Sequence, residues 1–187
     1  MSSNDVKLGI GLATGMFYHA PVGTALPTYP GETLASAWKH VGDVTQDGIT
    51  VTTDKSTENL KNWANAIKRV IMTDHTETIQ APVMDTTEEV LKTCIGASNV
   101  TTSAATATHG KLVNAALSSS SLPAPEMFLF LMKDGDDMMM VGCKGQIMSM
   151  EAVTFAPGAS VNWTPTITAL DNSLVFISDD GQKTVSA

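Results

Sequence analysis

Residues 127–150 read MFLFLMKDGDDMMMVGCKGQIMSM, and this stretch decides the predicted fold. Two apolar runs, 127–133 and 138–150, flank the segment Asp134-Gly135-Asp136-Asp137. An Asp-Gly segment between two apolar runs is the strongest short-range signal for a β-hairpin. The stretch therefore predicts two antiparallel strands joined by a tight turn.

The sequence on both sides of this hairpin also favours strands. Further strands are predicted at residues 14–20, 48–54, 66–83, 111–117, 151–155, 161–170 and 174–178. Asp47-Gly48 favours a tight turn before the second of these. The polar segment 55–65, which holds Trp63, predicts a loop or one helical turn. The class is mainly β, an open sheet, a β-sandwich or a partial barrel.

One helix is predicted, at about residues 86–96. Asp85 or Thr86 can cap its first turn, and Glu88 and Glu89 follow where the helix dipole favours negative charge. Gly96 is a natural end for the helix. Its apolar stripe comprises Val90, Leu91, Cys94 and Ile95. The helix is amphipathic, so we expect it to flank the β core.

The chain length of 187 residues fits a single domain, residues 1–187. Residues 1–36 hold many Gly and Pro and little periodicity, which predicts an extended N-terminal segment and arm. Residues 37–187 are expected to form the β core with the helix at 86–96. An arm of this length needs a neighbour to lie against, and another copy of the chain is one candidate.

Composition excludes some classes of function. The formal charge of -8 argues against a nucleic-acid binder, because basic groups supply most of that affinity. The longest apolar run, 127–132, is far shorter than the about 20 residues of a membrane-spanning helix, and nothing resembles a signal peptide. We expect a soluble protein, with no membrane partner, whose Ser, Thr and Asn gather in residues 97–121.

No set of catalytic residues is predicted. His75 and Glu77 share a strand face, which could be half of a metal site but is more typical of a solvated face. The Asp-rich segment 134–137 lacks the ligand spacing of a calcium loop. Cys94 and Cys143 are interpreted as small buried hydrophobic residues. We therefore expect a protein that is not an enzyme and has no cofactor or metal.

Several motifs resemble those of major tail proteins (tail tube proteins) of long-tailed, siphovirus-type bacteriophages. Residues 15–28, GMFYHAPVGTALPT, are similar to the family's A-P-x-G-T-x-x-P opening. Trp38, Gly42 and the segment 47–50 follow the spacing W-x-x-x-G-x-x-x-x-D-G-[IV]-T. The run EEVL at 88–91, the hairpin at 133–136 and a Thr-rich last strand add weaker similarity. Residues 97–121 depart from the common pattern, as a surface elaboration would.

The resemblance implies a phage tail-tube-type β-sandwich or partial barrel with a flanking helix. It implies a virion protein that polymerises as stacked hexameric rings into the tail tube, through which double-stranded DNA passes without specific binding. It also implies three partners besides the chain itself: the tape measure protein, the tail terminator and the distal tail protein. Assembly is expected in the cytoplasm of the bacterial host.

If the chain is a tail tube protein, two segments are candidate assembly sites. The expected contact arm between subunits or rings comprises Ala20, Pro21, Val22, Gly23, Thr24, Ala25, Leu26, Pro27 and Thr28. The expected tube-lining or assembly loop comprises Lys55, Ser56, Thr57, Glu58 and Asn59.

Two alternatives remain open. A β-sandwich carbohydrate-binding or adhesion module would need an exposed aromatic platform, for which the tryptophans are Trp38, Trp63 and Trp163. Within the phage reading, a head–tail joining or decoration protein is the other alternative. A metal-dependent hydrolase ranks below both.

Overall fold

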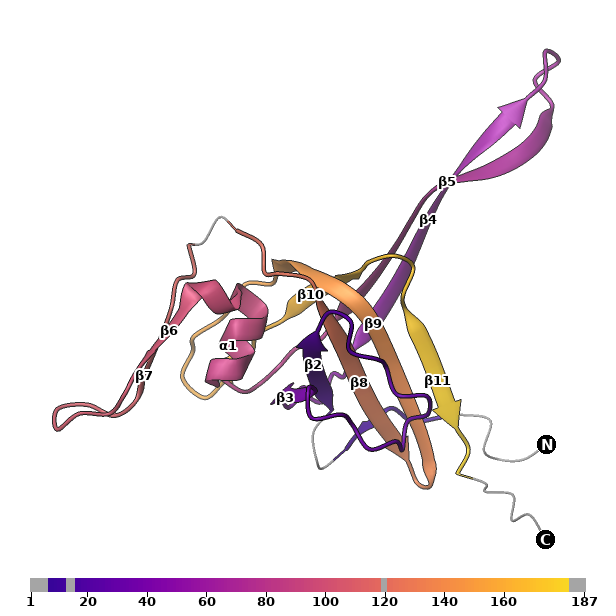
Figure 1. Cartoon of the computed structure of the whole chain (residues 1–187). Coiled ribbons are helices and arrows are strands. Elements are labelled where there is room, and N and C mark those ends of the chain that lie inside the picture. The colour runs from indigo at the N-terminus through magenta and orange to yellow at the C-terminus, as the bar shows by residue number, and fades with distance from the viewer. Residues whose placement is uncertain (1–6, 13–15, 119–120, 182–187) are drawn as a thin grey trace, which may run out of the picture.

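The computed structural model describes residues 7–12, 16–118 and 121–181 and is mainly β (Figure 1). The strands are β1 (Ile10–Gly11), β2 (Phe17–Pro21), β3 (Lys39–Gly42), β4 (Thr50–Lys61), β5 (Ile67–Gln80), β6 (Val100–Ser103), β7 (Leu112–Ala115), β8 (Glu126–Asp134), β9 (Asp137–Met150), β10 (Pro165–Ala169) and β11 (Val175–Asp179). The helix α1 spans Glu88–Ile95, and a 3₁₀ turn follows at Ala97–Asn99.

The predicted hairpin at residues 134–137 is confirmed and lies at the centre of the main sheet. Strands β8 and β9 pair antiparallel in continuous register from Glu126↔Gly145 to Asp134↔Asp137. The sheet has the order β3-β2-β8-β9-β10-β5-β4, with β1 also paired to β8 and β11 also paired to β9. Along its other edge β8 thus pairs with both β2 and β1, and β9 likewise pairs with both β10 and β11.

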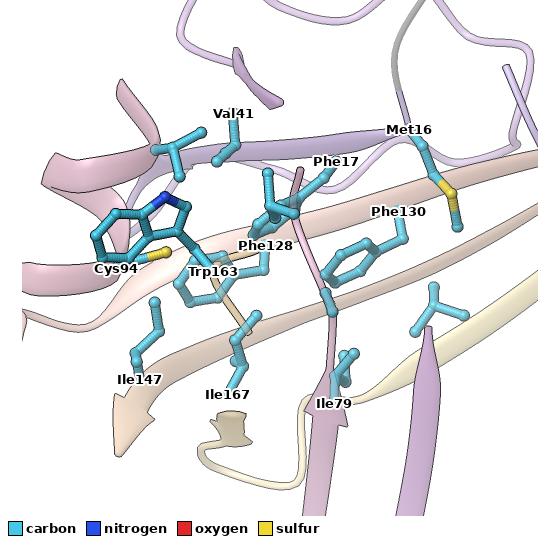
Figure 2. Close-up of a cluster of buried hydrophobic side chains, with 14 of the residues drawn as sticks. Met16, Phe17, Val41, Ile79, Cys94, Phe128, Phe130, Ile147, Trp163 and Ile167 are labelled. Atoms are coloured by element: carbon cyan, nitrogen blue, oxygen red, sulfur yellow. The ribbon is translucent and has the colours of Figure 1, made fainter. Parts of the chain in front are cut away.

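Side chains along β8 alternate between two separate apolar clusters. Phe128 and Phe130 point into the larger cluster, where Phe17 stacks on Phe130 with ring centroids 4.5 Å apart (Figure 2). Helix α1 covers this cluster with an apolar stripe that includes Val90 and Cys94. Leu129 belongs to the second cluster, on the opposite face. Both faces of the hairpin are therefore buried.

The N-terminal arm covers the second face. Leu26, Leu34 and Trp38 pack there, and Leu26 lies so close to Gly142 that a Cβ at that position would sit 2.7 Å from a Leu26 methyl. The neighbour against which these side chains lie is the chain's own sheet. For these three side chains the needed neighbour is therefore the second apolar face of the hairpin, while a contact of the arm's exposed residues with another copy stays a prediction.

The helix is confirmed, but its predicted cap is wrong. Thr87 is the N-cap, and its hydroxyl accepts a hydrogen bond from the Val90 amide. Thr86 instead accepts a hydrogen bond from the Trp163 indole N–H at 3.0 Å, and Asp85 accepts one from the Asp43 amide at 2.7 Å. Both predicted caps are thus used in tertiary contacts. Gly96, with φ 97°, ends the helix as expected.

Other boundaries differ from the prediction. Residues 151–155 are not a strand, because the Glu151 amide binds the Thr164 carbonyl and the chain then leaves the sheet until β10. The Thr- and Ser-rich segment 97–121 contains a second, two-stranded sheet, the hairpin β6–β7. Strand β7 corresponds to the predicted strand at 111–117. Of the strand predicted at 14–20, residues 14 and 15 lie outside the described residues.

The stacked phenylalanines give a test of the core. Phe130 is fully buried, so Phe130→Ala is expected to lower the free energy of unfolding by about 3–5 kcal/mol. Urea unfolding followed by tryptophan fluorescence measures this loss. Phe155→Ala is the matched control, because Phe155 is 70% exposed and its truncation should change stability by less than about 0.5 kcal/mol. Equal losses in the two variants would contradict the assignment of the core.

Candidate assembly interface

Strands β4 and β5 form a long ribbon that projects away from the rest of the molecule (Figure 1). Their pairing runs from Thr50↔Gln80 to Lys61↔Ile67. Only the base of β5, at residues 78–80, also pairs with β10, so the outer ribbon has two strands. Every residue of β4 is exposed. The ribbon therefore presents both of its faces and the outer edge of β4 to the surroundings.

The ribbon corrects the prediction for residues 55–65. Residues 55–61 lie in β4, so the candidate segment Lys55–Asn59 is part of a strand and not of a loop. The turn comes later, where Asn65 has φ 61° and the Asn62 side chain accepts a hydrogen bond from the Ala66 amide. Sequence reasoning missed the strand because both of its faces are polar enough to hide the usual alternation.

Large apolar side chains are exposed along the outer ribbon and at its tip. They are Leu60, Trp63, Ile67, Val70 and Met72, and Trp63 is 106% exposed. An isolated two-stranded ribbon is marginally stable in water and needs a surface to pack against. Alternation along the strands places Leu60 on one face of the ribbon and Val70 and Met72 on the other. Large apolar side chains exposed in this way mark a candidate interaction site.

The tryptophans do not form a platform. Trp38 and Trp163 are buried, at 8% and 3% exposure, and only Trp63 projects outward. An exposed aromatic platform built from these three residues, as a carbohydrate-binding module would need, is absent.

The two predicted assembly segments lie in different parts of the molecule. Ala20 and Pro21 belong to β2, and Gly23 (φ 95°) turns the chain so that the Thr24 amide and hydroxyl bind the Pro21 carbonyl. Val22 is half-exposed beside this turn. The segment 55–59 lies along the projecting ribbon instead. That either segment contacts another subunit stays a prediction.

His19 joins three elements in a buried ion-pair cluster. Its Nδ1 lies 2.7 Å from a Glu126 carboxylate oxygen at the start of β8, and its Nε2 lies 2.9 Å from a Glu89 oxygen on α1. Lys39 of β3 lies 3.8 Å from the same Glu89 oxygen. Burial alone would lower the pKa of His19, but the hydrogen bonds and charges of Glu126 and Glu89 outweigh it and raise that pKa. The cluster fixes the helix against β2 and β8.

The remaining candidate groups show no catalytic arrangement. His75 Nε2 lies 3.4 Å from a Glu77 carboxylate oxygen, and the two residues share one strand face as predicted. The favoured interpretation of a solvated face is wrong, because the two side chains are only 21% and 17% exposed. Within the described ranges, no group of three or more His, Cys, Asp or Glu residues could hold a metal ion. Cys94 and Cys143 are buried as predicted, and burial raises the pKa of each thiol to about 12. Among the described residues, no helix is long and apolar enough to cross a membrane.

A β protein with its own buried core and a projecting ribbon of exposed strands is typical of the subunits of structural assemblies. Comparison of sequences makes this specific. The family model described as phage tail tube protein matches residues 1–184, and the chain belongs to this family. It is a structural protein of a phage virion tail, and the family implies self-assembly into a tube. No curated protein matches the chain.

The His19 cluster predicts a defined pH dependence of stability. Because its pKa is raised in the folded state, the stabilisation by His19 is complete below the ordinary value of 6.5 and is lost as pH rises through the raised pKa. The Tm of the wild type should therefore be higher than that of His19→Gln at about pH 6. This difference in Tm should be smaller at about pH 9. Thermal unfolding followed by circular dichroism checks this.

His109→Gln serves as the control, since His109 is exposed on the β6–β7 connection and binds its neighbour's backbone carbonyl. It should leave the Tm-against-pH curve of the wild type unchanged. If the difference in Tm between wild type and His19→Gln increased with pH, the stabilising role of protonated His19 would be wrong.

Proposed function

We propose that this chain is the major tail protein of a long-tailed, siphovirus-type phage, which forms hexameric rings stacked into the tube that conducts DNA during ejection. The observation that carries the proposal is the β4–β5 ribbon, which is hydrogen-bonded within itself yet exposes apolar side chains that the described part of its own chain does not cover. Such a ribbon becomes stable when neighbouring copies cover it.

The free edge of β4 supports the same function. Within the described residues, β4 stands at the end of the strand order and pairs along one edge only, with β5. A long unpaired edge recruits another strand, and pairing in a closed ring satisfies it. If each of six subunits contributes four strands, as the family resemblance implies, the ring closes a barrel of about 24 strands. At about 4.8 Å spacing and about 40° tilt, such a barrel has a backbone diameter of roughly 48 Å. Side chains narrow this bore, and duplex DNA still passes.

The acidic net charge of the chain supports a tube that DNA passes through without being bound. DNA carries a dense line of phosphates, and a bore rich in Lys and Arg would bind it. The chain has 11 Lys and Arg against 19 Asp and Glu, which suits a wall that repels phosphate or ignores it. We propose no catalytic activity and no cofactor for this role.

The remaining parts of the proposal follow from the family. Residues 1–187 act as one tail tube domain, assembled in the cytoplasm of the bacterial host. The tape measure protein, the tail terminator and the distal tail protein are the proposed partners at the inside and the ends of the tube. The exposed residues of the arm 20–28 and the strand segment 55–59 are proposed contacts between subunits.

Shortening the ribbon tests the proposal. A variant in which an Asn-Gly dipeptide replaces residues 58–71 joins Thr57 to Met72, a register pair of the ribbon. Because the ribbon contributes little to the subunit's core, the variant should keep the wild-type Tm. It should form no tubes when concentrated protein is viewed by negative-stain electron microscopy, whereas wild type should form rings and tubes of fixed width.

A second shortened hairpin is the matched control. An Asn-Gly dipeptide in place of residues 104–111 joins Ser103 to Leu112, the last register pair of β6–β7. Residues 104–111 contain no large apolar side chain. Their removal also removes the ion pair of Lys111 with Glu88, 2.6 Å apart, which contributes little because the Lys111 side chain is 60% exposed. This control should form tubes. Tubes of normal width and length from the variant that lacks 58–71 would contradict the proposal.

A further inference from the structure

Residues 7–11 lie beside the turn of the β8–β9 hairpin. Strand β1 pairs antiparallel with β8 near the end of that strand. The Leu8 amide donates a hydrogen bond to an Asp134 carboxylate oxygen at 2.9 Å. The side-chain amine of Lys7 forms an ion pair with the Asp137 carboxylate, which lies 130 positions further along the chain. These contacts fix an amine and a carboxylate against each other.

The ion pair of Lys7 with Asp137 has a buried carboxylate. The Asp137 side chain is 5% exposed, and the Lys7 side chain is 28% exposed. In the ion pair of Lys144 with Asp171, whose charged atoms are 2.6 Å apart, the Asp171 side chain is 73% exposed. A carboxylate out of water has lost the hydration that stabilises its charge, and even a paired buried charge is costly. A reaction that removes both charges of the pair is therefore favoured at Asp137 and not at Asp171.

Two further carboxylates lie near the amine. The pKa of Lys7 is raised, first by its hydrogen bond to Asp137 and then by the charges of Asp137, Asp134 and Asp180, which together outweigh the effect of burial. The amine is therefore protonated at neutral pH, and a proton must leave it before it can act as a nucleophile. Asp134 is held in place by the hydrogen bond from the Leu8 amide. A positioned second carboxylate is thus available to take that proton.

We propose that Lys7 and Asp137 condense into an isopeptide bond, so that the folded subunit carries a covalent cross-link between residues 7 and 137. The new bond joins Lys7 Nζ to Asp137 Cγ, and one C–O bond of the carboxylate breaks. The ammonium group loses two protons, and both leave with the departing oxygen as one water molecule. The reaction needs no oxidant, reductant or other reactant. Its product ties the N-terminal segment to the β8–β9 turn.

Asp134 is the proposed carrier of one of these protons. Its carboxylate takes a proton from the ammonium group, which leaves a free lone pair on Nζ beside the Asp137 carboxyl group. The second proton passes directly across the ion pair from Nζ to an Asp137 oxygen. After Nζ has attacked Cγ, Asp134 returns its proton to the departing oxygen. One positioned carboxylate thus acts first as a general base and then as a general acid.

The fold supplies what the condensation of an amine with a carboxylate lacks in water. Groups held in a well-oriented contact react as if their concentration were about 10⁵ M or more. Burial of Asp137 also limits the access of water to its carboxyl carbon, which protects the product from hydrolysis. Lys144 and Asp171 have the contact but not the burial, so they are expected to remain an ion pair.

Intact-mass spectrometry of the denatured wild-type chain tests the bond directly. An ion pair separates in guanidinium and leaves the full mass of the chain, whereas the isopeptide bond lowers that mass by one water molecule. After proteolysis, tandem mass spectrometry should find a branched peptide that joins residue 7 to residue 137. A wild-type chain that keeps its full mass after folding and incubation at neutral pH would overturn the inference.

Two lysine variants locate the loss of water. Lys7→Arg keeps the positive charge, but its guanidinium is not deprotonated in proteins, so this variant should keep its full mass. Lys144→Arg is the matched control at the exposed ion pair and should lose one water molecule as the wild type does. A cyclic imide at an aspartate also lowers the mass by one water molecule and does not require Lys7. The same loss in Lys7→Arg would therefore overturn the inference.

Asp134→Asn tests the proton carrier. An asparagine at this position can still accept the hydrogen bond from the Leu8 amide but cannot take a proton from Lys7. The lighter chain should therefore appear about tenfold or more slowly after refolding. Asp136→Asn is the matched control, because Asp136 is exposed in the same turn and the change removes the same charge. Equal rates in the two variants would overturn the role of Asp134.

The inference does not depend on the proposed function, because the reaction takes place within one folded molecule. A wild type that forms tubes and keeps its full mass would overturn the cross-link and leave the tube intact. A wild type that carries the branched peptide and forms no tubes would support the cross-link and overturn the proposed function.

Discussion

Alternation along β8 is the constraint on which the rest of the subunit depends. Successive apolar side chains of that strand point to opposite faces, so a single cover would leave half of them in water. Helix α1 covers the face that holds Phe128 and Phe130, and the N-terminal arm covers the face that holds Leu129. The buried ion pairs of His19 then tie the helix to β2 and β8, which fixes one cover relative to the sheet.

The ribbon departs from this arrangement. Its backbone groups bind one another along β4 and β5, yet no second layer formed by the described residues lies on its outer part. The body of the subunit buries its own core, while the outer ribbon of the single chain stays exposed. This division suits a member of a family that assembles into a tube.

Sequence predicted the parts of the fold that local chemistry determines. The Asp-Gly turn at 134–137, the acidic first turn of α1 and the stop at Gly96 each depend on neighbours in the chain, and all three are confirmed. The cap failed because Asp85 and Thr86 bind distant groups. The strand β4 was missed beyond residue 54 because all of its residues are exposed, so no alternation of buried and exposed side chains marks it in the sequence. The family motifs pointed to the assembly, and the contacts of segments 20–28 and 55–59 with other subunits stay predictions.

The burial of both thiols has a practical consequence. Cys94 and Cys143 are the chain's only cysteines, and a pKa of about 12 keeps them as unreactive thiols at neutral pH. The folded subunit should therefore react only slowly with maleimide reagents. Any cysteine introduced on its outside would accept a dye, a drug or a gold cluster at one site per subunit, at the regular spacing that the lattice of the tail imposes.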